Sequence, residues 1–193
     1  MPDPRPPVRT RASRKRRHLI AAAVFALLVP VFTAPAALAA SGRTEIQLQD
    51  RCDPTSFTAA GIPCVGKGDV TLNELVATLN PDDFGHDKWR FSREQTHIVE
   101  GEKLHLTNTG GEFHTFSEVV KFGPSPILPP DAQILNAVFP PNKKVAQPIG
   151  DPFEVALEPG MSADLQHPLG VGVHRFECMI HPWMQTTVEV RRR

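Results

Sequence analysis

The sequence predicts an all-β protein in which short strands form a β-sandwich, preceded by a disulfide-closed loop and one short helix. Three observations support this prediction. From about Trp89 onward apolar residues recur with a period of two, turn residues separate these segments, and helical spacing is confined to one segment before them. Short strands of alternating polarity at such intervals are typical of sandwiches. A length of 193 residues suits one domain with appendages.

Residues 1–39 have the parts of a secretory signal peptide. A basic region ends in the pair Arg16 and Arg17, an apolar run follows up to Phe32, and small residues lead to Ala39. We expect cleavage after this alanine. An uncleaved membrane anchor is the alternative, but the run is short for a bilayer span of ~20 residues. The arginine pair is similar to a twin-arginine signal. We therefore expect a secreted, periplasmic or cell-surface protein whose mature chain has no membrane span.

The formal net charge of zero hides two parts of opposite sign. The chain has 21 Lys and Arg against 21 Asp and Glu, but residues 1–39 contain seven basic residues and one acid. The mature chain keeps 14 basic and 20 acidic residues, a net charge of −6. An acidic protein is a poor candidate for nucleic-acid binding. Its charge favours a protein partner with a basic docking face.

The mature chain contains three cysteines, an odd number that leaves one thiol over. Export permits disulfides, and Cys52 and Cys64 frame a short segment rich in turn formers. We expect them to pair, which would stabilise the fold by about 3 kcal/mol in the chain-entropy model. Residues 40–68 are then a loop held by this disulfide. Cys178 is the remaining thiol.

Residues 40–91 are expected to form an N-terminal extension that contains the one helix. Thr71 and Glu74 have capping-box spacing, and Leu72 and Leu75 begin an apolar stripe at helical spacing. The pattern ends before Pro81.

Residues 92–193 are expected to form the sandwich. Strands are predicted at 96–100, 103–108, 112–120, 153–157, 163–167, 173–178 and 186–190. A proline-rich segment, 122–152, interrupts them. A segment of that length in a small domain covers a site, shapes a docking surface or is simply a loop.

The leftover thiol lies in a motif with the ligands of a copper site. Cys178, His181 and Met184 have the spacing C-x2-H-x2-M. Thiolate, imidazole and thioether suit copper, and two His, one Cys and a weak axial Met describe an electron-transfer copper centre. The second His is offered by His114, which follows Asn108 near the mouth of another predicted strand.

These residues give the C-terminal half a specific resemblance. It resembles the cupredoxins, the small blue-copper proteins such as plastocyanin and amicyanin, over roughly residues 92–193. The short gap between His181 and Met184 is similar to the ligand loop of amicyanin. The resemblance implies a Greek-key β-sandwich, with one type 1 copper ion bound by His114, Cys178, His181 and Met184. Thr115 stands where family members often carry Asn, and its hydroxyl is expected to tie the two ligand loops together.

The resemblance also implies a function. We expect a monomeric one-electron carrier and not an enzyme, with the edge of His181 as the exit for the electron. Phe113, Pro182 and Trp183 would form an apolar docking patch for the redox partner; core packing is an equal alternative for the tryptophan.

Other classes of site and function fit less well. A structural zinc site prefers four strong ligands and does not use Met. A binuclear copper centre needs a second Cys in the loop, and multicopper oxidases use His-x-His pairs that this chain lacks. Copper delivery outside the cytoplasm, with the same ligands, is the alternative function. A recognition domain in which copper is secondary is a third possibility.

Overall fold

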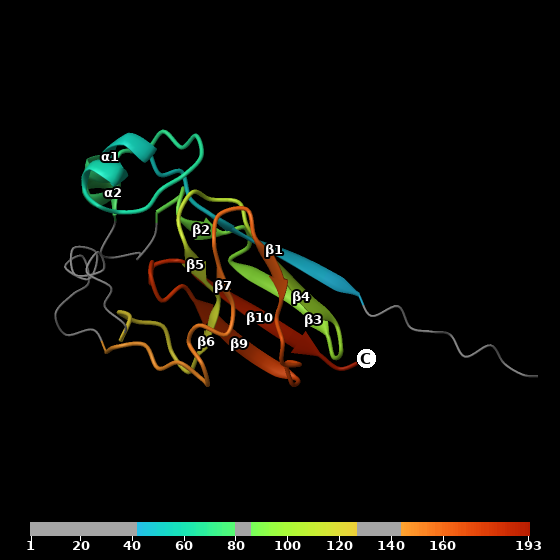
Figure 1. Ribbon diagram of the computed structural model, residues 1–193. Helices are drawn as coiled ribbons and strands as arrows, with labels where there is room; N and C mark the ends of the chain where they lie inside the picture. The colour runs from blue at the N-terminus through green and yellow to red at the C-terminus, as the bar shows by residue number, and fades with distance from the viewer. Residues whose placement is uncertain (1–41, 80–85, 127–143) are drawn as a thin grey trace, which may run out of the picture. The chain divides into compact units, whose positions relative to one another are not determined.

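A computed structural model describes residues 42–79, 86–126 and 144–193, all within one compact unit, Ala39–Arg193. The predicted signal peptide and the middle of the proline-rich segment lie outside the described residues. Two four-stranded sheets form most of this unit, and their strands run side by side in Figure 1. The prediction of an all-β sandwich is confirmed.

The first sheet has the strand order β2-β1-β4-β8. Its strands are β2 (Arg90–Phe91), β1 (Arg43–Gln49), β4 (Lys103–Asn108) and β8 (Ser162–Asp164). β1 runs parallel to β4, with Leu48 opposite Asn108, and the other pairs are antiparallel. Strands β1 and β2 belong to the predicted N-terminal extension, so the extension and the predicted copper-binding domain share one sheet.

The second sheet has the strand order β3-β10-β9-β6. Its strands are β3 (Gln95–Val99), β10 (Gln185–Arg191), β9 (Gly172–Glu177) and β6 (Ser117–Val119). β3 is parallel to β10, and the remaining pairs are antiparallel. A separate short pair joins β5 (His114–Thr115) to β7 (Ala156–Leu157). The strand expected at 112–120 is therefore divided between β5 and β6.

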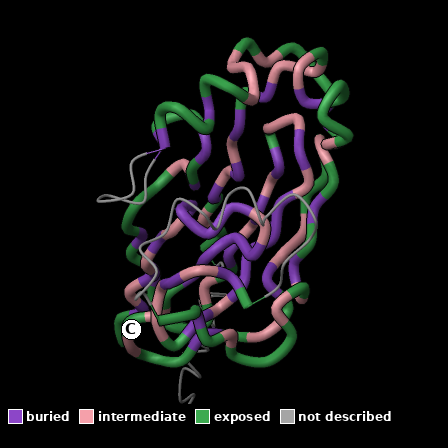
Figure 2. Tube along the Cα trace, turned by 90° about the vertical axis from the view of Figure 1, so that its left-hand side faces the viewer, coloured by how far each residue is buried: buried purple, intermediate pink, exposed green. Residues whose placement is uncertain are grey.

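The core lies between the two sheets because alternate residues of β1, β3, β4 and β10 point inward. In β4, Leu104 and Leu106 are buried, and in β10 Val188 and Val190 are buried. Figure 2 shows the buried residues gathered in the interior. Burying one such side chain contributes about 1.5–3 kcal/mol, so this alternation is the main source of stability.

The predicted helix is present, and its start is set by the predicted cap. Helix α2 (Leu72–Thr78) begins after Thr71, whose side chain accepts a hydrogen bond from the backbone N–H of Glu74. The Glu74 side chain accepts from the backbone N–H of Thr71 in return, which completes the capping box.

The expectation that residues 40–68 are loop throughout was wrong. Strand β1 and a second helix, α1 (Pro54–Ala59), lie in this region. In β1 Ile46 and Leu48 alternate with polar residues, so the period of two was present in the sequence. Helix α1 begins after Asp53, whose side chain accepts from the backbone N–H of a residue in the first turn.

The predicted disulfide is confirmed. Cys52 and Cys64 are bonded, with Cα atoms 6.3 Å apart, and Cys178 is the free, buried thiol. The bond closes the segment that contains α1, whose Phe57 is buried and stacks on Trp89 at a centroid distance of 6.0 Å. The segment is thereby attached to the edge of the sandwich. Among the described residues no helix has the length and apolar character to cross a bilayer.

Candidate metal centre

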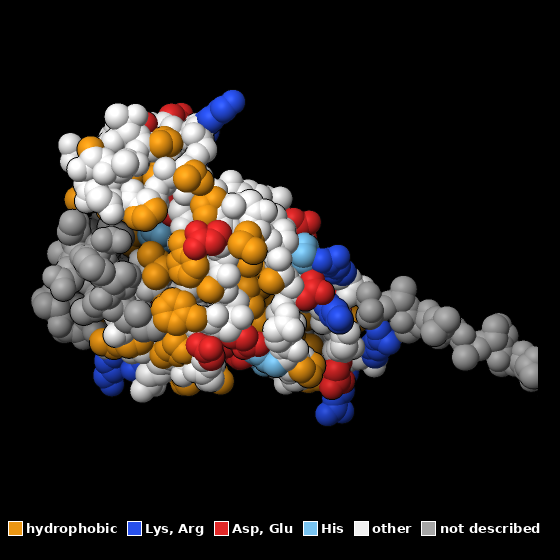
Figure 3. Space-filling model, viewed as in Figure 1, with side chains coloured by type: hydrophobic (Ala, Val, Ile, Leu, Met, Phe, Trp, Pro, Cys, Tyr) orange, Lys and Arg blue, Asp and Glu red, His pale blue; other side chains and the backbone are white. Residues whose placement is uncertain are grey.

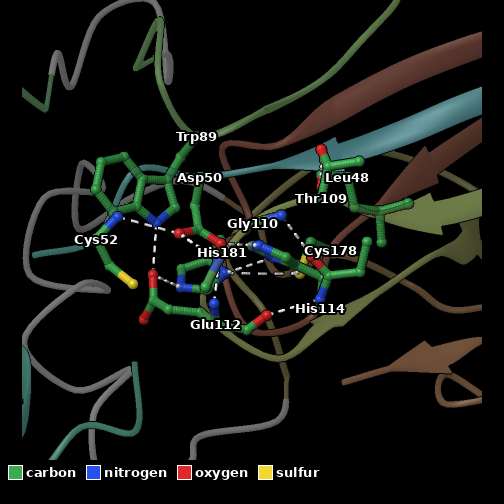
Figure 4. A network of polar contacts seen from close by, with 12 residues as sticks. Leu48, Asp50, Cys52, Trp89, Thr109, Gly110, Glu112, His114, Cys178 and His181 are labelled. Carbon is green, nitrogen blue, oxygen red and sulfur yellow. Dashed lines mark hydrogen bonds and ion pairs between the residues drawn. The ribbon is translucent and has the colours of Figure 1, made fainter. Parts of the chain in front are cut away.

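Three of the four predicted ligands converge on one point at the end of the second sheet. His114 begins β5, Cys178 directly follows β9, and His181 lies in the loop before β10. The Cys178 Sγ atom is 3.8 Å from His114 Nδ1 and 3.9 Å from His181 Nδ1, and the two nitrogens are 3.1 Å apart (Figure 4). The exposed fraction of each of the three residues is 2% or less.

This triangle of donor atoms has the size that a metal ion requires. A point equidistant from the three atoms lies about 2.1 Å from each of them, which is the length of a metal–imidazole bond and slightly shorter than a zinc–thiolate bond. The donor set is one soft thiolate and two imidazoles, a combination that suits copper. The residues present therefore fit a mononuclear copper ion.

Backbone hydrogen bonds join the two ends of the ligand loop, residues 178–184. The N–H of Cys178 donates to the carbonyl of Met184 at 3.1 Å, and the N–H of Met184 donates to the carbonyl of His181 at 2.8 Å. Met184 is fully buried in the main core. Its role as the axial ligand stays a prediction.

Thr115 ties the two ligand segments together, as expected from its position after His114. Its hydroxyl accepts from the backbone N–H of Met179 at 2.7 Å. Its own backbone N–H points at the Cys178 sulfur at 3.4 Å. A hydrogen bond to the charged form of a thiol favours that form, so this contact supports a thiolate.

The turn that leads to His114 is held by Asn108. The side-chain amide of Asn108 donates to the carbonyls of Glu112 and Leu157, and its oxygen accepts from the N–H of Gly110. Gly111 lies so close to the disulfide loop that an added Cβ would be 2.1 Å from the Val65 carbonyl oxygen. Only glycine allows this approach.

Two acidic residues that the sequence did not reveal complete the site. The Asp50 carboxylate lies 2.8 Å from His114 Nε2, and Asp50 follows the end of β1. The Glu112 carboxylate lies 3.4 Å from His181 Nε2 and accepts from the Trp89 indole N–H at 2.6 Å. Both acidic residues are buried.

The electrostatics of the metal-free cluster favour a thiolate at Cys178 and a carboxylate at Asp50. Burial would raise the pKa of Cys178, but hydrogen bonds and charges from His114 and His181 outweigh it and hold this pKa well below the usual range. Burial would likewise raise the pKa of Asp50, yet His114 and two backbone N–H groups lower it. Burial would lower the pKa of His181, whereas the charge of Glu112 and the Cys178 contact raise it. The site is built to hold a thiolate.

The residues of the predicted docking patch do not form a continuous exposed surface in the described part of the chain. Pro182 and Trp183 are buried, and Phe113 is partly buried. His181 is 2% exposed and lies edge-on to Trp183 at 5.3 Å. Docking at these residues stays a prediction. Figure 3 shows hydrophobic side chains grouped on one face of the described residues, with acidic side chains among them.

No protein-family model and no curated protein sequence matches the chain. Solved structures similar to it include a purple cupredoxin from Nitrosopumilus maritimus, with a TM-score of 0.36 and 16% identity over 58% of this chain and 95% of that chain. A variant of amicyanin in the Cu(I) form has a TM-score of 0.33 and 14% identity over 53% and 73% of the two chains. A variant of reduced amicyanin has a TM-score of 0.34 and 15% identity, over 55% of this chain and 77% of that chain. Similarities as low as these do not indicate the activity of this chain, which depends on its own residues.

The strand order and the cluster at the end of β9 are features of the chain itself. Two four-stranded sheets enclose one core, and a buried group of His114, Cys178 and His181 lies where the ligand segments meet. The described part of the chain is therefore a β-sandwich with the three donor residues buried at one end, which is the arrangement that the sequence resemblance implies.

Proposed function

We propose that the mature chain is an exported one-electron carrier with a single type 1 copper ion. His114, Cys178 and His181 would hold the ion, with Met184 as the axial ligand. The observation that carries this proposal is the buried triangle of two imidazole nitrogens and one sulfur. Bound copper would supply the Cu(II)/Cu(I) couple.

The residues around the triangle explain how the site would work. A carrier must change its geometry little between oxidation states, which requires ligands held by the protein. The backbone bonds within the Cys178–Met184 loop, the hydroxyl of Thr115 and the amide of Asn108 fix the ligand segments to each other and to the core. The ligand side chains are also shielded from water.

Burial of the ligands favours a carrier over an enzyme or a delivery protein. With exposed fractions of 0% for His114 and Cys178 and 2% for His181, a substrate would have no direct access to the ion. Exchange of the metal with a partner would be slow for the same reason. We also infer that the partner presents a basic face, because the mature chain has a net charge of −6.

Copper titration of the purified mature protein tests the proposal. One equivalent of Cu(II) should produce intense visible absorption from charge transfer between the thiolate and copper, and Cys178→Ser should remove it. His181→Gln should weaken or shift the band, whereas the matched variant His97→Gln, at an exposed site, should leave it unchanged. A wild-type complex without this absorption would contradict the proposal.

Voltammetry in the presence of a Cu(I) chelator separates a carrier from a copper-delivery protein. A carrier should cycle reversibly and keep its metal. Loss of copper to the chelator within one cycle would instead support delivery.

A further inference from the structure

Both candidate histidine ligands face a buried carboxylate on the side away from the thiol. The His114 Nε2 atom lies 2.8 Å from Asp50 Oδ2, and the His181 Nε2 atom lies 3.4 Å from Glu112 Oε2 (Figure 4). The two acidic residues have exposed fractions of 7% and 5%. Burying an acidic side chain is costly unless its partners compensate, so this double pairing requires an explanation.

The pairing fixes which ring nitrogen of each histidine is free to bind a metal. A neutral imidazole donates from one nitrogen and accepts, or ligates, at the other. A carboxylate at Nε2 keeps the proton there and leaves the lone pair on Nδ1. The Nδ1 atoms of His114 and His181 are the two that lie 3.1 Å apart and face Cys178.

The carboxylates are themselves held in place. Asp50 accepts from the backbone N–H groups of Cys52, Gly111 and Glu112 at 2.9–3.1 Å. Glu112 accepts from the Trp89 indole at 2.6 Å. Within the described residues neither carboxylate forms an ion pair with Lys or Arg. Each negative charge is therefore directed at an imidazole.

We propose that Asp50 and Glu112 are positioning residues that set the redox balance of the copper centre by stabilising Cu(II) over Cu(I), an inference that rests on the proposed function. An imidazole that donates to a carboxylate is a stronger base and a better ligand. A buried negative charge also favours the ion of higher charge. Both effects act in the same direction, so the pair lowers the reduction potential.

This inference gives the segment after β1 a role at the centre. Asp50 reaches His114 from the first sheet, across 64 residues of sequence. The backbone N–H groups of Cys52 and Gly111 both donate to the Asp50 carboxylate, and Cys52 is also one end of the disulfide. The N-terminal region is then part of the metal site and not only a cover for the sandwich.

Glu112→Gln is the sharper variant, because glutamine keeps an oxygen that can accept from Trp89 and removes the charge. Loss of a carboxylate partner typically costs 10–100-fold in metal affinity, and we expect the larger loss for Cu(II). Each tenfold fall in the ratio of Cu(II) affinity to Cu(I) affinity raises the reduction potential by about 59 mV for a one-electron couple. Asp50→Asn should shift the potential in the same direction.

Matched controls carry the same substitutions at partly exposed histidine–carboxylate pairs away from the triangle. Glu154 contacts His167 Nδ1 at 2.7 Å, and Asp164 contacts His105 Nδ1 at 2.7 Å. Glu154→Gln and Asp164→Asn should leave the potential unchanged. If Glu112→Gln folds, binds copper with the wild-type absorption and keeps the wild-type potential, the inference is overturned while the proposed function stands. Wild-type protein that never develops the absorption would instead overturn the proposed function.

A measurement on the wild type keeps the test independent of variant folding. In protein loaded with Zn(II), which is diamagnetic, long-range proton–nitrogen NMR spectra identify the protonated nitrogen of each imidazole. The inference predicts a proton on Nε2 of both His114 and His181, protected from exchange with solvent. A proton on Nδ1, or no protected proton on either ring, would overturn it.

Discussion

Removing the disulfide tests the role of the N-terminal segment, and the variant Cys52→Ala/Cys64→Ala does so without adding polar groups. The bond spans a sequence separation of 12 residues. In the chain-entropy model, freeing a loop of this length increases the entropy of the unfolded chain enough to lower the free energy of unfolding by about 3 kcal/mol at 25 °C. For the metal-free protein this is a large share of the 5–15 kcal/mol typical of a domain.

Equilibrium urea unfolding of the metal-free protein measures this loss. Wild-type protein under reducing conditions is the matched control, and it should lose a similar amount. The folded variant should still bind copper, because Asp50 is also held by the pairing of β1 with β4. A loss below about 1 kcal/mol would refute the reasoning, since it would mean that the disulfide does not restrict the unfolded chain.

Three further variants test the local contacts. Gly111→Ala should lower the free energy of unfolding by about 1–3 kcal/mol, because the new Cβ would lie 2.1 Å from the Val65 carbonyl oxygen. The control variant Gly170→Ala has open space around the new Cβ, so its free energy of unfolding should change little in the same urea experiment. Thr115→Val should cost about 1–3 kcal/mol in thermal or urea unfolding, because a buried backbone N–H loses its acceptor; an unchanged midpoint would contradict this. Burial lowers the pKa of His167, but its contacts with Glu154 and Glu118 outweigh burial and raise this pKa above 6.5. Its stabilisation is therefore present below about pH 6.5 and lost as pH rises through the folded-state pKa, so His167→Gln should destabilise the protein more at about pH 5.5 than at about pH 9. Equal losses at both pH values would contradict that sign.

The ligand set was largely accessible from the sequence because its signals are local. Cys178, His181 and Met184 fall within seven residues, and a thiol left over in a chain that is expected to be exported needs an explanation. His114 required the resemblance, since nothing local links it to a cysteine 64 residues away. The structure then places three of these four residues together.

The roles of Asp50 and Glu112 could not be predicted from the sequence, because they depend on contacts between distant segments. Each contact joins two segments that are distant in sequence, and the Asp50 contact also depends on the register between β1 and β4. An Asp two residues before a Cys and a Glu that follows two glycines have no local pattern that distinguishes them from surface acidic residues. Strand β1 differs from these contacts, because its alternation of polar and apolar residues is visible in the sequence and the disulfide constrains only the segment from Cys52 to Cys64.

X-ray absorption spectroscopy of the copper-loaded mature protein tests the central claim most directly, because it reports the atoms bound to the metal. The account predicts one short copper–sulfur bond and two copper–nitrogen bonds to imidazole at about 2 Å. It also predicts that these distances change little on reduction. A shell of nitrogen and oxygen alone, without a short copper–sulfur bond, would contradict the proposal that His114, Cys178 and His181 form a type 1 copper site.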